Sequence, residues 1–230
     1  MTNYKIDAYL NSGAGKIMGQ NYFVIIGDMV QSRNLNDRQK VQEAFGSALK
    51  NAQKTYGQGI VSPLTLTIGD EFQAVLDRAQ DFFAIINHLE ESLPDIRFRY
   101  GLGVGEISTA LNRKAAIGMD GPAFHFARQA LEQARQMKRR FVFVCASPKI
   151  QARIDLFFNW IDTITAGWSK EKLQILHLSQ LRLKQKEVAA KIGISQPAVS
   201  QHMRQPVFRL VLQTQQVVLD EIDDLLRSAK

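Results

Sequence analysis

Apolar positions along the chain follow two spacings, and these predict an ordered series of strands and helices. Short apolar or alternating runs predict strands, and apolar residues three or four apart predict helices. The predicted strands are Tyr22–Gly27, Pro63–Ile68, Glu71–Leu76, Ile96–Val104 and Phe141–Ala146. The predicted helices are Asn36–Tyr56, Ala79–Leu93, Pro122–Met137, Lys149–Ile161, Ser169–Leu181 and Phe208–Leu226, with a short helical pair before the last of them.

The order of these elements predicts an α/β (α+β) protein followed by an all-α part. Strand, helix, hairpin, helix and strand form a ferredoxin-like core, and we expect a sandwich with its helices on one face. After Pro148 there is no strand signal. We therefore expect a leader or arm over residues 1–20, a sandwich domain over 21–147 and a helical domain over 148–230.

The segment from 185 to 204 has the features of a helix-turn-helix. Ala189 is small enough for two helices to cross closely, and Gly193 can take the left-handed conformation that ends a helix. Ser195 is a suitable N-cap for a second helix, with Pro197 in its first turn. The side chains expected to face DNA are Lys191, Ser195, Gln196, Ser200, Gln201 and Arg204. An ordinary helical hairpin is the alternative.

Charge favours the DNA-binding interpretation of this segment. Residues 169–210 carry eight basic and two acidic side chains, whereas the following 20 residues carry four acidic and two basic ones. The chain as a whole has 29 basic and 22 acidic residues, a formal net charge of +7. Because the excess positive charge lies on the motif, we expect double-stranded DNA as a partner.

Composition limits the compartment and the kind of site. Among 230 residues Cys145 is the only cysteine, which excludes intramolecular disulfides and cysteine-cluster metal sites. A reducing compartment is expected, and the cytoplasm is the simplest one. No apolar run approaches the roughly 20 residues of a membrane helix, so no membrane partner is expected.

Two aspartates occupy matching places in the predicted sandwich. Asp28 ends the first strand, in GDMVQSR, and Asp70 lies in the hairpin turn of TIGDEFQ. The first strand of a ferredoxin-like core lies beside the hairpin, so the two carboxylates can face each other. Paired carboxylates at strand ends can hold Mg²⁺ against a triphosphate, although either aspartate alone is often only a turn or cap residue. We predict that Asp28 and Asp70 are metal ligands.

The segment TIGDEFQAVL resembles the metal-binding hairpin of class III nucleotidyl cyclases, and Arg99–Gly105 resembles the glycine-rich strand that follows it there. The segment from Gly118 to Ala134 is similar to the cyclase segment that enters the helix carrying catalytic side chains. GDMVQSR, IGDEFQ and the C-terminal helix-turn-helix together resemble the SatD family over nearly the whole chain from about Tyr22. The resemblance implies a class III cyclase-like sandwich with Asp28 and Asp70 as metal ligands.

The chain departs from the cyclase pattern at the positions that read the base and carry catalysis. Leu66 stands where the resemblance implies a base-reading lysine or glutamate, and His125 stands where it implies an asparagine that contacts ribose. Gln129 stands where it implies the arginine that stabilises the transition state, and Arg128 is expected to point to a different helix face. These departures favour nucleotide binding without turnover.

Further ligand contacts are assigned to Ser32, Arg33, Glu71 and Arg139. Arg139 belongs to a basic cluster with Arg135, Lys138 and Arg140, for which a solvated helix end is the main alternative. The sequence thus predicts a DNA-binding regulatory protein whose cyclase-like domain binds a nucleotide or phosphorylated ligand with Mg²⁺, as a homodimer that reads two half-sites. The alternative is an atypical nucleotidyl cyclase or nucleotidyltransferase whose helix-turn-helix only localises it.

Overall fold

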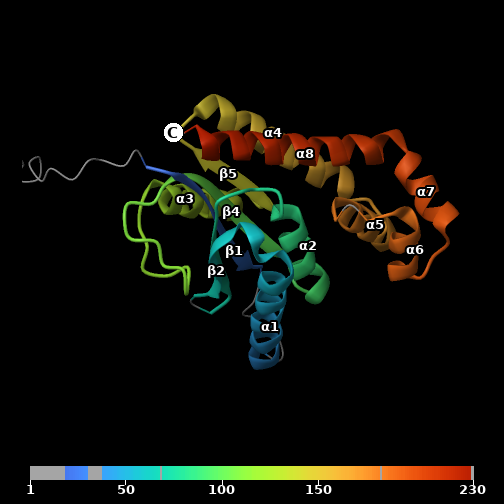
Figure 1. Cartoon of the computed structure of the whole chain (residues 1–230), viewed down its shortest axis with the longest axis horizontal. Helices are drawn as coiled ribbons and strands as arrows, with labels where there is room; N and C mark the ends of the chain where they lie inside the picture. The colour runs from blue at the N-terminus through green and yellow to red at the C-terminus, as the bar shows by residue number, and fades with distance from the viewer. Residues whose placement is uncertain (1–18, 31–37, 68, 182, 229–230) are drawn as a thin grey trace, which may run out of the picture.

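A central five-stranded sheet organises the N-terminal two thirds of the chain in a computed structural model that describes residues 19–30, 38–67, 69–181 and 183–228 (Figure 1). The strands are β1 (Asn21–Met29), β2 (Ile60–Leu66), β3 (Glu71–Leu76), β4 (Phe98–Glu106) and β5 (Phe141–Cys145). Their order across the sheet is β2-β3-β1-β4-β5, with β5 parallel to β4 and the other pairs antiparallel. The first four strands have the ferredoxin-like arrangement, which confirms the predicted fold class.

Helices cover both faces of the sheet, so the prediction that they lie on one face is wrong. The first face carries α1 (Arg38–Tyr56), which leads through a short 3-10 turn (Gly57–Gly59) into β2, and α2 (Phe82–Ser92). The second face carries α3 (Pro122–Met137). The physical reason lies in β1, where Phe23 and Ile25 pack in the first core while Val24 and Ile26 pack in the second. A strand that is apolar on both sides needs cover on both sides.

Helix α3 lies unusually close to β4 because the facing strand positions are glycines. A Cβ atom at Gly101 would lie 2.2 Å from the carbonyl oxygen of Ala127, and one at Gly103 would lie 2.4 Å from that of Ala123. Both helix residues are alanines with no exposed surface. The glycine-rich strand of the sequence is therefore the docking surface for the helix.

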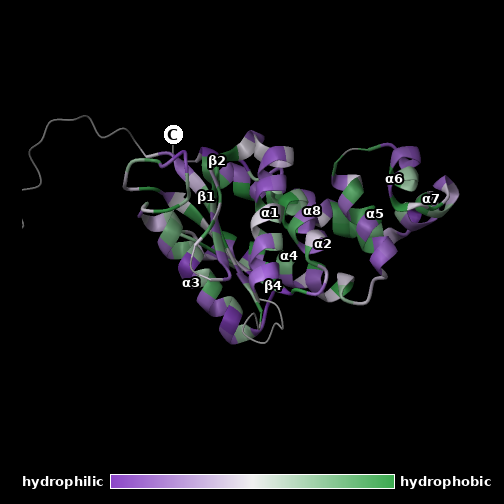
Figure 2. Ribbon diagram, turned by 90° about the horizontal axis from the view of Figure 1, so that it is seen from below, coloured by the Kyte–Doolittle hydropathy of each residue, from purple (hydrophilic) through white to green (hydrophobic). Residues whose placement is uncertain are grey.

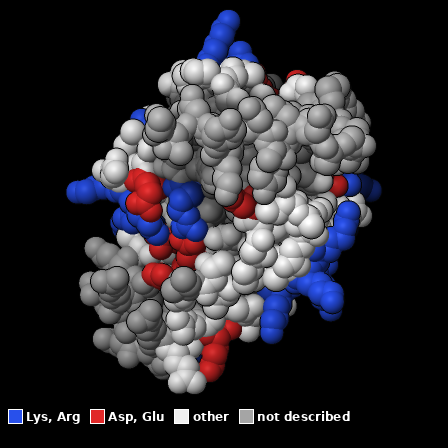
Figure 3. All heavy atoms as spheres, turned by 90° about the vertical axis from the view of Figure 1, so that its left-hand side faces the viewer, with Lys and Arg blue, Asp and Glu red and all other residues white. Residues whose placement is uncertain are grey.

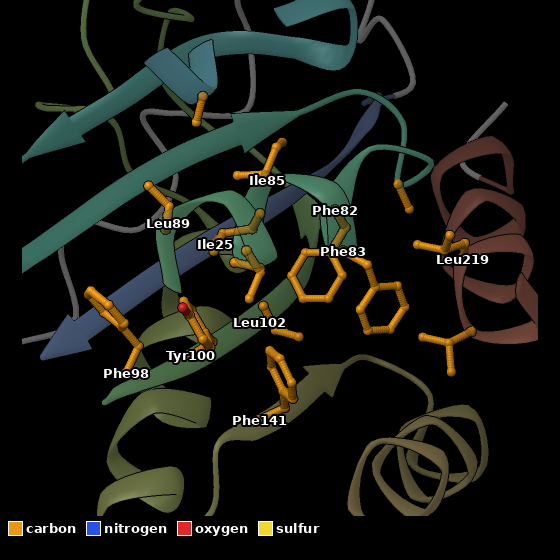
Figure 4. Packing of buried hydrophobic residues seen from close by; sticks show 14 of the residues in the cluster. Ile25, Phe82, Phe83, Ile85, Leu89, Phe98, Tyr100, Leu102, Phe141 and Leu219 are labelled. Atoms are coloured by element: carbon orange, nitrogen blue, oxygen red, sulfur yellow. The ribbon is translucent and has the colours of Figure 1, made fainter. Parts of the chain in front are cut away.

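Aromatic side chains fill the core between the sheet and the first helical face (Figure 4). The ring of Phe82 contacts those of Phe23 and Phe141, with centroid separations of 5.5 and 5.8 Å. Tyr100 stacks on Phe141 at 5.2 Å, and Leu219 approaches the same cluster from the C-terminal helix. One continuous core thus joins the sheet to the C-terminal helices.

The C-terminal part is helical throughout its described length, as predicted. It comprises α4 (Pro148–Thr165), α5 (Lys170–Gln180), α6 (Gln185–Ile192), α7 (Gln196–Arg204) and α8 (Pro206–Arg227). Helices α4 and α8 lie along the sheet, while α5, α6 and α7 form a group at one end of the molecule (Figures 1 and 2). A domain boundary near residue 148 stays a prediction, and the predicted arm over residues 1–20 falls almost wholly outside the described residues.

Helix α8 uses its apolar stripe inside its own chain. Val211, Val218 and Ile222 have no exposed surface and belong to the main core. Asp223 fixes the same helix to the connection between β3 and α2 by accepting a hydrogen bond from the backbone N–H of Ala79 at 2.6 Å. The apolar stripe of α8 therefore packs within the chain.

The surface of the molecule carries charges of both signs. On the side drawn in Figure 3, acidic side chains gather next to basic ones in one cluster, and other basic side chains project separately. Among the residues described, none of the helices has the length and apolar character needed to cross a membrane.

Candidate functional site

Three strands bring a row of charged side chains together at one end of the sheet. Asp28 on β1 is opposite Glu71 on β3 and opposite Arg99 on β4. Because side chains alternate between the faces of a strand, Asp28 lies on the same face as Val24 and Ile26, which is the face covered by α3. The row Glu71–Asp28–Arg99 therefore lies under the C-terminal half of that helix.

The hairpin turn places Asp70 next to this row. Gly69 has a φ of 74°, a left-handed conformation that favours glycine, and the carbonyl of Asp70 accepts a hydrogen bond from the N–H of Met29 at 3.2 Å. The negative charge of Asp70 acts on Asp28 and helps to raise its pKa. The two aspartates of the predicted metal site therefore lie near each other, and their role as metal ligands stays a prediction.

Two arginines of α3 cover the carboxylates. Arg128 donates two hydrogen bonds to the carboxylate of Glu71, at 2.6 and 2.8 Å. Arg135 donates from Nε to Asp28 at 2.9 Å and lies 3.7 Å from Glu71. The two arginines are seven residues apart, two helical turns, so they project from one side of α3.

Burial dominates the electrostatics of Asp28. Its side chain is only 8% exposed, and burial raises the pKa of its carboxyl above the usual value. The hydrogen bond and charge of Arg135 oppose that rise, as does the charge of Arg99, whereas Asp70 adds to it. Desolvation therefore contributes more to the raised pKa of Asp28 than repulsion by Asp70 does.

The two aspartates suit a metal ion that binds together with a phosphate-bearing ligand. Within the described ranges no group of three or more histidine, cysteine, aspartate or glutamate side chains could hold a metal ion. Mg²⁺ is usually held by one or two carboxylates together with substrate phosphates and water. Asp28 and Asp70 fit that pattern, in which the phosphates complete the coordination.

Positive charge at the site comes from residues that the sequence comparison with cyclases did not select. Gln129 is exposed and has no part in the row, whereas Arg128 points at Glu71. His125 is exposed and contacts Asp120 at 2.7 Å. Arg128 and Arg135 therefore bring two guanidinium groups to the row, and the loss of the catalytic arginine at Gln129 stays a prediction. Their spacing of seven along a predicted helix was the signal that could have identified them.

The remaining predicted ligand contacts divide into three cases. Glu71 is part of the row, and Ser32 and Arg33 lie outside the described residues. Arg139 lines a hollow that it shares with Arg135 and Arg99, but no hydrogen bond or ion pair joins it to the carboxylates of the described row. The interpretation of Arg135 as part of a solvated helix end is wrong, since it pairs with Asp28.

The pair α6–α7 has the local geometry predicted for it. Gly193 ends α6 with a φ of 75°, and the hydroxyl of Ser195 accepts a hydrogen bond from the N–H of Ala198 at the start of α7. Val188 and Val199 are fully buried between the helices and the rest of the chain. His202, at a position where an aliphatic residue is commoner, contacts Glu171 of α5 at 3.1 Å.

The side chains predicted to face DNA lie on the outside of this pair. Lys191, Gln196, Gln201 and Arg204 are exposed, and Ser200 is half-buried. The hydroxyl oxygen of Ser195 accepts the helix-capping hydrogen bond from Ala198, which leaves its O–H as a donor for a contact. DNA binding stays a prediction.

Comparison with known proteins connects the chain to one family. The sequence model described as the SatD family matches residues 22–222. No curated protein matches the chain.

Solved structures that are similar to the chain include three from nucleotide cyclases. The guanylyl cyclase domain of the RhoGC fusion protein from the aquatic fungus Blastocladiella emersonii is 16% identical over 50% of this chain and 75% of that one, with a TM-score of 0.40. A bacterial light-regulated adenylyl cyclase is 15% identical over 54% and 75%, with a TM-score of 0.41. The guanylate cyclase domain of RhGC from Catenaria anguillulae, in complex with GTP, is 17% identical over 49% and 72%, with a TM-score of 0.38. Likeness at this level assigns no activity to the chain.

Proposed function

The chain belongs to the SatD family, and we propose that its sheet domain, residues 21–147, binds a nucleoside triphosphate together with Mg²⁺ at the end of β1 and β3. Asp28 and Asp70 hold the metal ion, and the arginines of α3 bind the phosphates. The observation that carries the proposal is the meeting of Asp28 and Glu71 with Arg128 and Arg135 under one helix.

The charges of the row explain why both nucleotide and metal are required. Without a ligand, Arg135 neutralises Asp28 and Arg128 neutralises Glu71. A bound Mg²⁺ takes over the neutralisation of the carboxylates, which releases the guanidinium groups to form bidentate contacts with phosphate. Either ligand alone leaves one set of charges without a partner, so binding of the two is coupled.

Titration of the full chain with ATP and GTP, each with Mg²⁺ or with EDTA, tests this proposal. We expect a rise in melting temperature only when nucleotide and Mg²⁺ are both present, because a ligand that binds the native state stabilises it. Asp70→Asn should abolish the rise. The matched control is Asp224→Asn, an aspartate 76% exposed near the end of α8. A rise that survives in Asp70→Asn excludes the proposed site.

Nucleotidyl transfer is the activity that fits this site better than binding alone. The arginines of α3 supply the charge that offsets negative charge on a phosphoryl group as it is transferred. The chain is then an atypical nucleotidyl cyclase or nucleotidyltransferase. Release of pyrophosphate from ATP or GTP that is lost in Asp70→Asn is the measurement that separates turnover from binding.

DNA binding by α6 and α7 is a second candidate function, in the helical unit from residue 148 to 230. It is favoured by the exposure of Gln196, Gln201 and Arg204 along one side of α7, over a buried Val199. This is the arrangement in which a second helix offers polar side chains to the major groove. Two chains would then bind two half-sites as a symmetric dimer.

A further inference from the structure

A hollow of about 640 Å³ lies between the sheet and the C-terminal helices, apart from the hairpin that carries Asp70. Its walls come from α2, the start of β5, α4 and α5. Pockets for small molecules usually have volumes of roughly 300 to 1,000 Å³, so this one has a suitable size. Neither the nucleotide site proposed at the end of β1 and β3 nor the pair α6–α7 uses this hollow.

Basic side chains form one wall of the hollow. Arg97, Lys138 and Arg139 line it. Within the described part of the chain their side chains make no hydrogen bond or ion pair, although the charge of Arg139 acts on the carboxylate of Asp155 and lowers its pKa against the rise caused by burial. Two acidic residues, Glu90 and Asp162, line it as well, but Arg140 binds both, at 2.7 and 3.2 Å. The net charge offered to a ligand is therefore positive.

Lys138 holds its place in this wall in an unfavourable conformation. It caps α3 with a φ of 54°, the left-handed region where glycine is normally found. Among the described residues it is the only one other than glycine with a positive φ. Residues kept in such conformations cluster at ligand sites, where the strain serves the function. The turn it makes carries Arg139 to the hollow.

The other walls are suited to the uncharged part of a ligand. Asn159 and Thr163 are one helical turn apart on α4 and line the hollow. The hydroxyl of Thr163 donates to the backbone carbonyl of Asn159 at 2.7 Å, so it offers a ligand an acceptor, and Asn159 offers its amide. Phe83 and Leu176 contribute apolar surface from α2 and α5. The hollow thus combines cations, hydrogen-bonding groups and an apolar wall.

We propose that this hollow binds a small organic phosphate, with the phosphate on Arg97, Lys138 and Arg139 and the polar body of the ligand against Asn159 and Thr163. The same three cations also line the hollow that contains Arg99 and Arg135, so the two proposed sites are neighbours, but binding in this one requires no metal ion. Because α5 forms one wall and packs against α6 and α7, the bound ligand restrains the helical end of the molecule against α2.

Calorimetric titration of the full chain in EDTA with ribose 5-phosphate, inorganic phosphate and ribose tests the proposal. We expect ribose 5-phosphate to bind more tightly than inorganic phosphate and ribose not to bind. Arg139→Ala should weaken binding at least about tenfold, the effect of losing one charged contact to phosphate. The matched control Lys114→Ala removes an exposed cation from the loop between β4 and α3 and should change nothing.

Lys138→Gly provides a test that loss of folding cannot imitate. Glycine relieves the left-handed strain, so the melting temperature should rise, while affinity for ribose 5-phosphate should fall severalfold. Asp70→Asn should leave this affinity unchanged, which separates the hollow from the nucleotide site. The proposal is overturned by absence of binding at millimolar ribose 5-phosphate, by equal affinity for inorganic phosphate, or by unchanged affinity in Arg139→Ala.

Discussion

Arg135 donates a hydrogen bond from Nε to the Oδ2 atom of Asp28 over 2.9 Å, across the interface between α3 and the central strand. The carboxylate is almost fully buried, whereas the guanidinium is 35% exposed. The pair therefore ties the helix to the sheet and keeps a buried charge neutralised. It also means that the candidate site is held together by the groups a ligand would engage.

Arg135→Ala should destabilise the protein by about 1–2 kcal/mol at pH 7, less than for a fully buried pair because the arginine is partly exposed. Burial raises the pKa of Asp28 in the folded state above the ordinary value of 3.8. The protonated carboxyl therefore favours the folded state, and this contribution to the unfolding free energy is fully present below pH 3.8. That stability is lost as the pH rises through the folded-state pKa. Removing Arg135 raises the pKa further and enlarges the loss.

Urea denaturation at pH 4 and pH 7 measures this effect. The difference between wild type and Arg135→Ala should be larger at pH 7 than at pH 4. In an Asp28→Asn background the same substitution should show a smaller pH dependence, because the buried carboxyl is gone and only the pairs with Glu71 and Glu132 remain. If Arg135→Ala destabilises the protein that retains Asp28 equally at pH 4 and pH 7, the arginine acts through packing alone.

Arg140 has a structural role that its neighbours in the basic cluster lack. It binds Glu90 through two nitrogens, at 2.7 and 3.0 Å, and Asp162 at 3.2 Å, and it lies over the ring of Phe141. Burial lowers the pKa of Arg140, but the two carboxylates outweigh that effect and raise it. The guanidinium therefore stays charged and neutralises both acids.

Arg140→Ala should accordingly cost about 2–3 kcal/mol of unfolding free energy, because it leaves Glu90 and Asp162 close together without their cation. The arginine side chain is 30% exposed, so the cost is smaller than for a fully buried pair. Chemical denaturation followed by tryptophan fluorescence measures the loss. Arg97→Ala is the control, an exposed cation on the same side whose removal should change stability by less than about 0.5 kcal/mol. A similar cost for both variants would contradict the structural role assigned to Arg140.

Substitutions of two glycines should have opposite effects on stability. In Gly103→Ala the new methyl group meets the backbone of α3 at 2.4 Å, so helix and sheet must separate at a cost of about 3 kcal/mol. In Gly46→Ala, within α1, the methyl group meets nothing within 4 Å, and the better helix former should add about 0.5–1 kcal/mol. Melting temperatures of the two variants provide the test. A stable Gly103→Ala protein would show that α3 does not pack against β4 at this distance.

The spacing of apolar residues and the positions of glycine and proline predicted most helices and strands. The strand Glu71–Leu76 and the helix Pro122–Met137 have the predicted ends, because a glycine turn precedes the strand and a proline begins the helix. The placement of the helices on the sheet depends on tertiary contacts instead. The pairing of α3 with the second face of the sheet depends on small residues at Gly101 and Gly103 meeting alanines far along the chain.

The charged row was only partly accessible to sequence reasoning. The proximity of Asp28 and Asp70 could be predicted from the order of the strands, because each aspartate follows a glycine at the end of a strand. Arg99 and Arg135 depend on strand register and helix placement, which a pattern of apolar residues does not specify. The left-handed conformation of Lys138 could not be predicted either, because lysine has no preference for the left-handed position that ends a helix.

If α6 and α7 bind DNA, their side chains should divide into two classes. Lys191 and Arg204 are exposed cations, so replacing either with alanine should weaken binding to all sequences and reduce the salt dependence by about one unit of slope. Gln196→Ala and Gln201→Ala should instead reduce preference at particular base pairs, each by about 1–3 kcal/mol.

A duplex selected by the full chain from a random pool supplies the target, and fluorescence anisotropy over a range of salt measures affinity. Two chains per duplex are expected by sedimentation. Lys114→Ala is the matched control, because it removes one positive charge from the loop between β4 and α3, and this loop lies at the opposite end of the molecule from α7 (Figure 1). If that control weakens binding as much as Arg204→Ala does, the affinity reflects overall charge and the two helices have no specific role; if the full chain selects no duplex, DNA is not the partner.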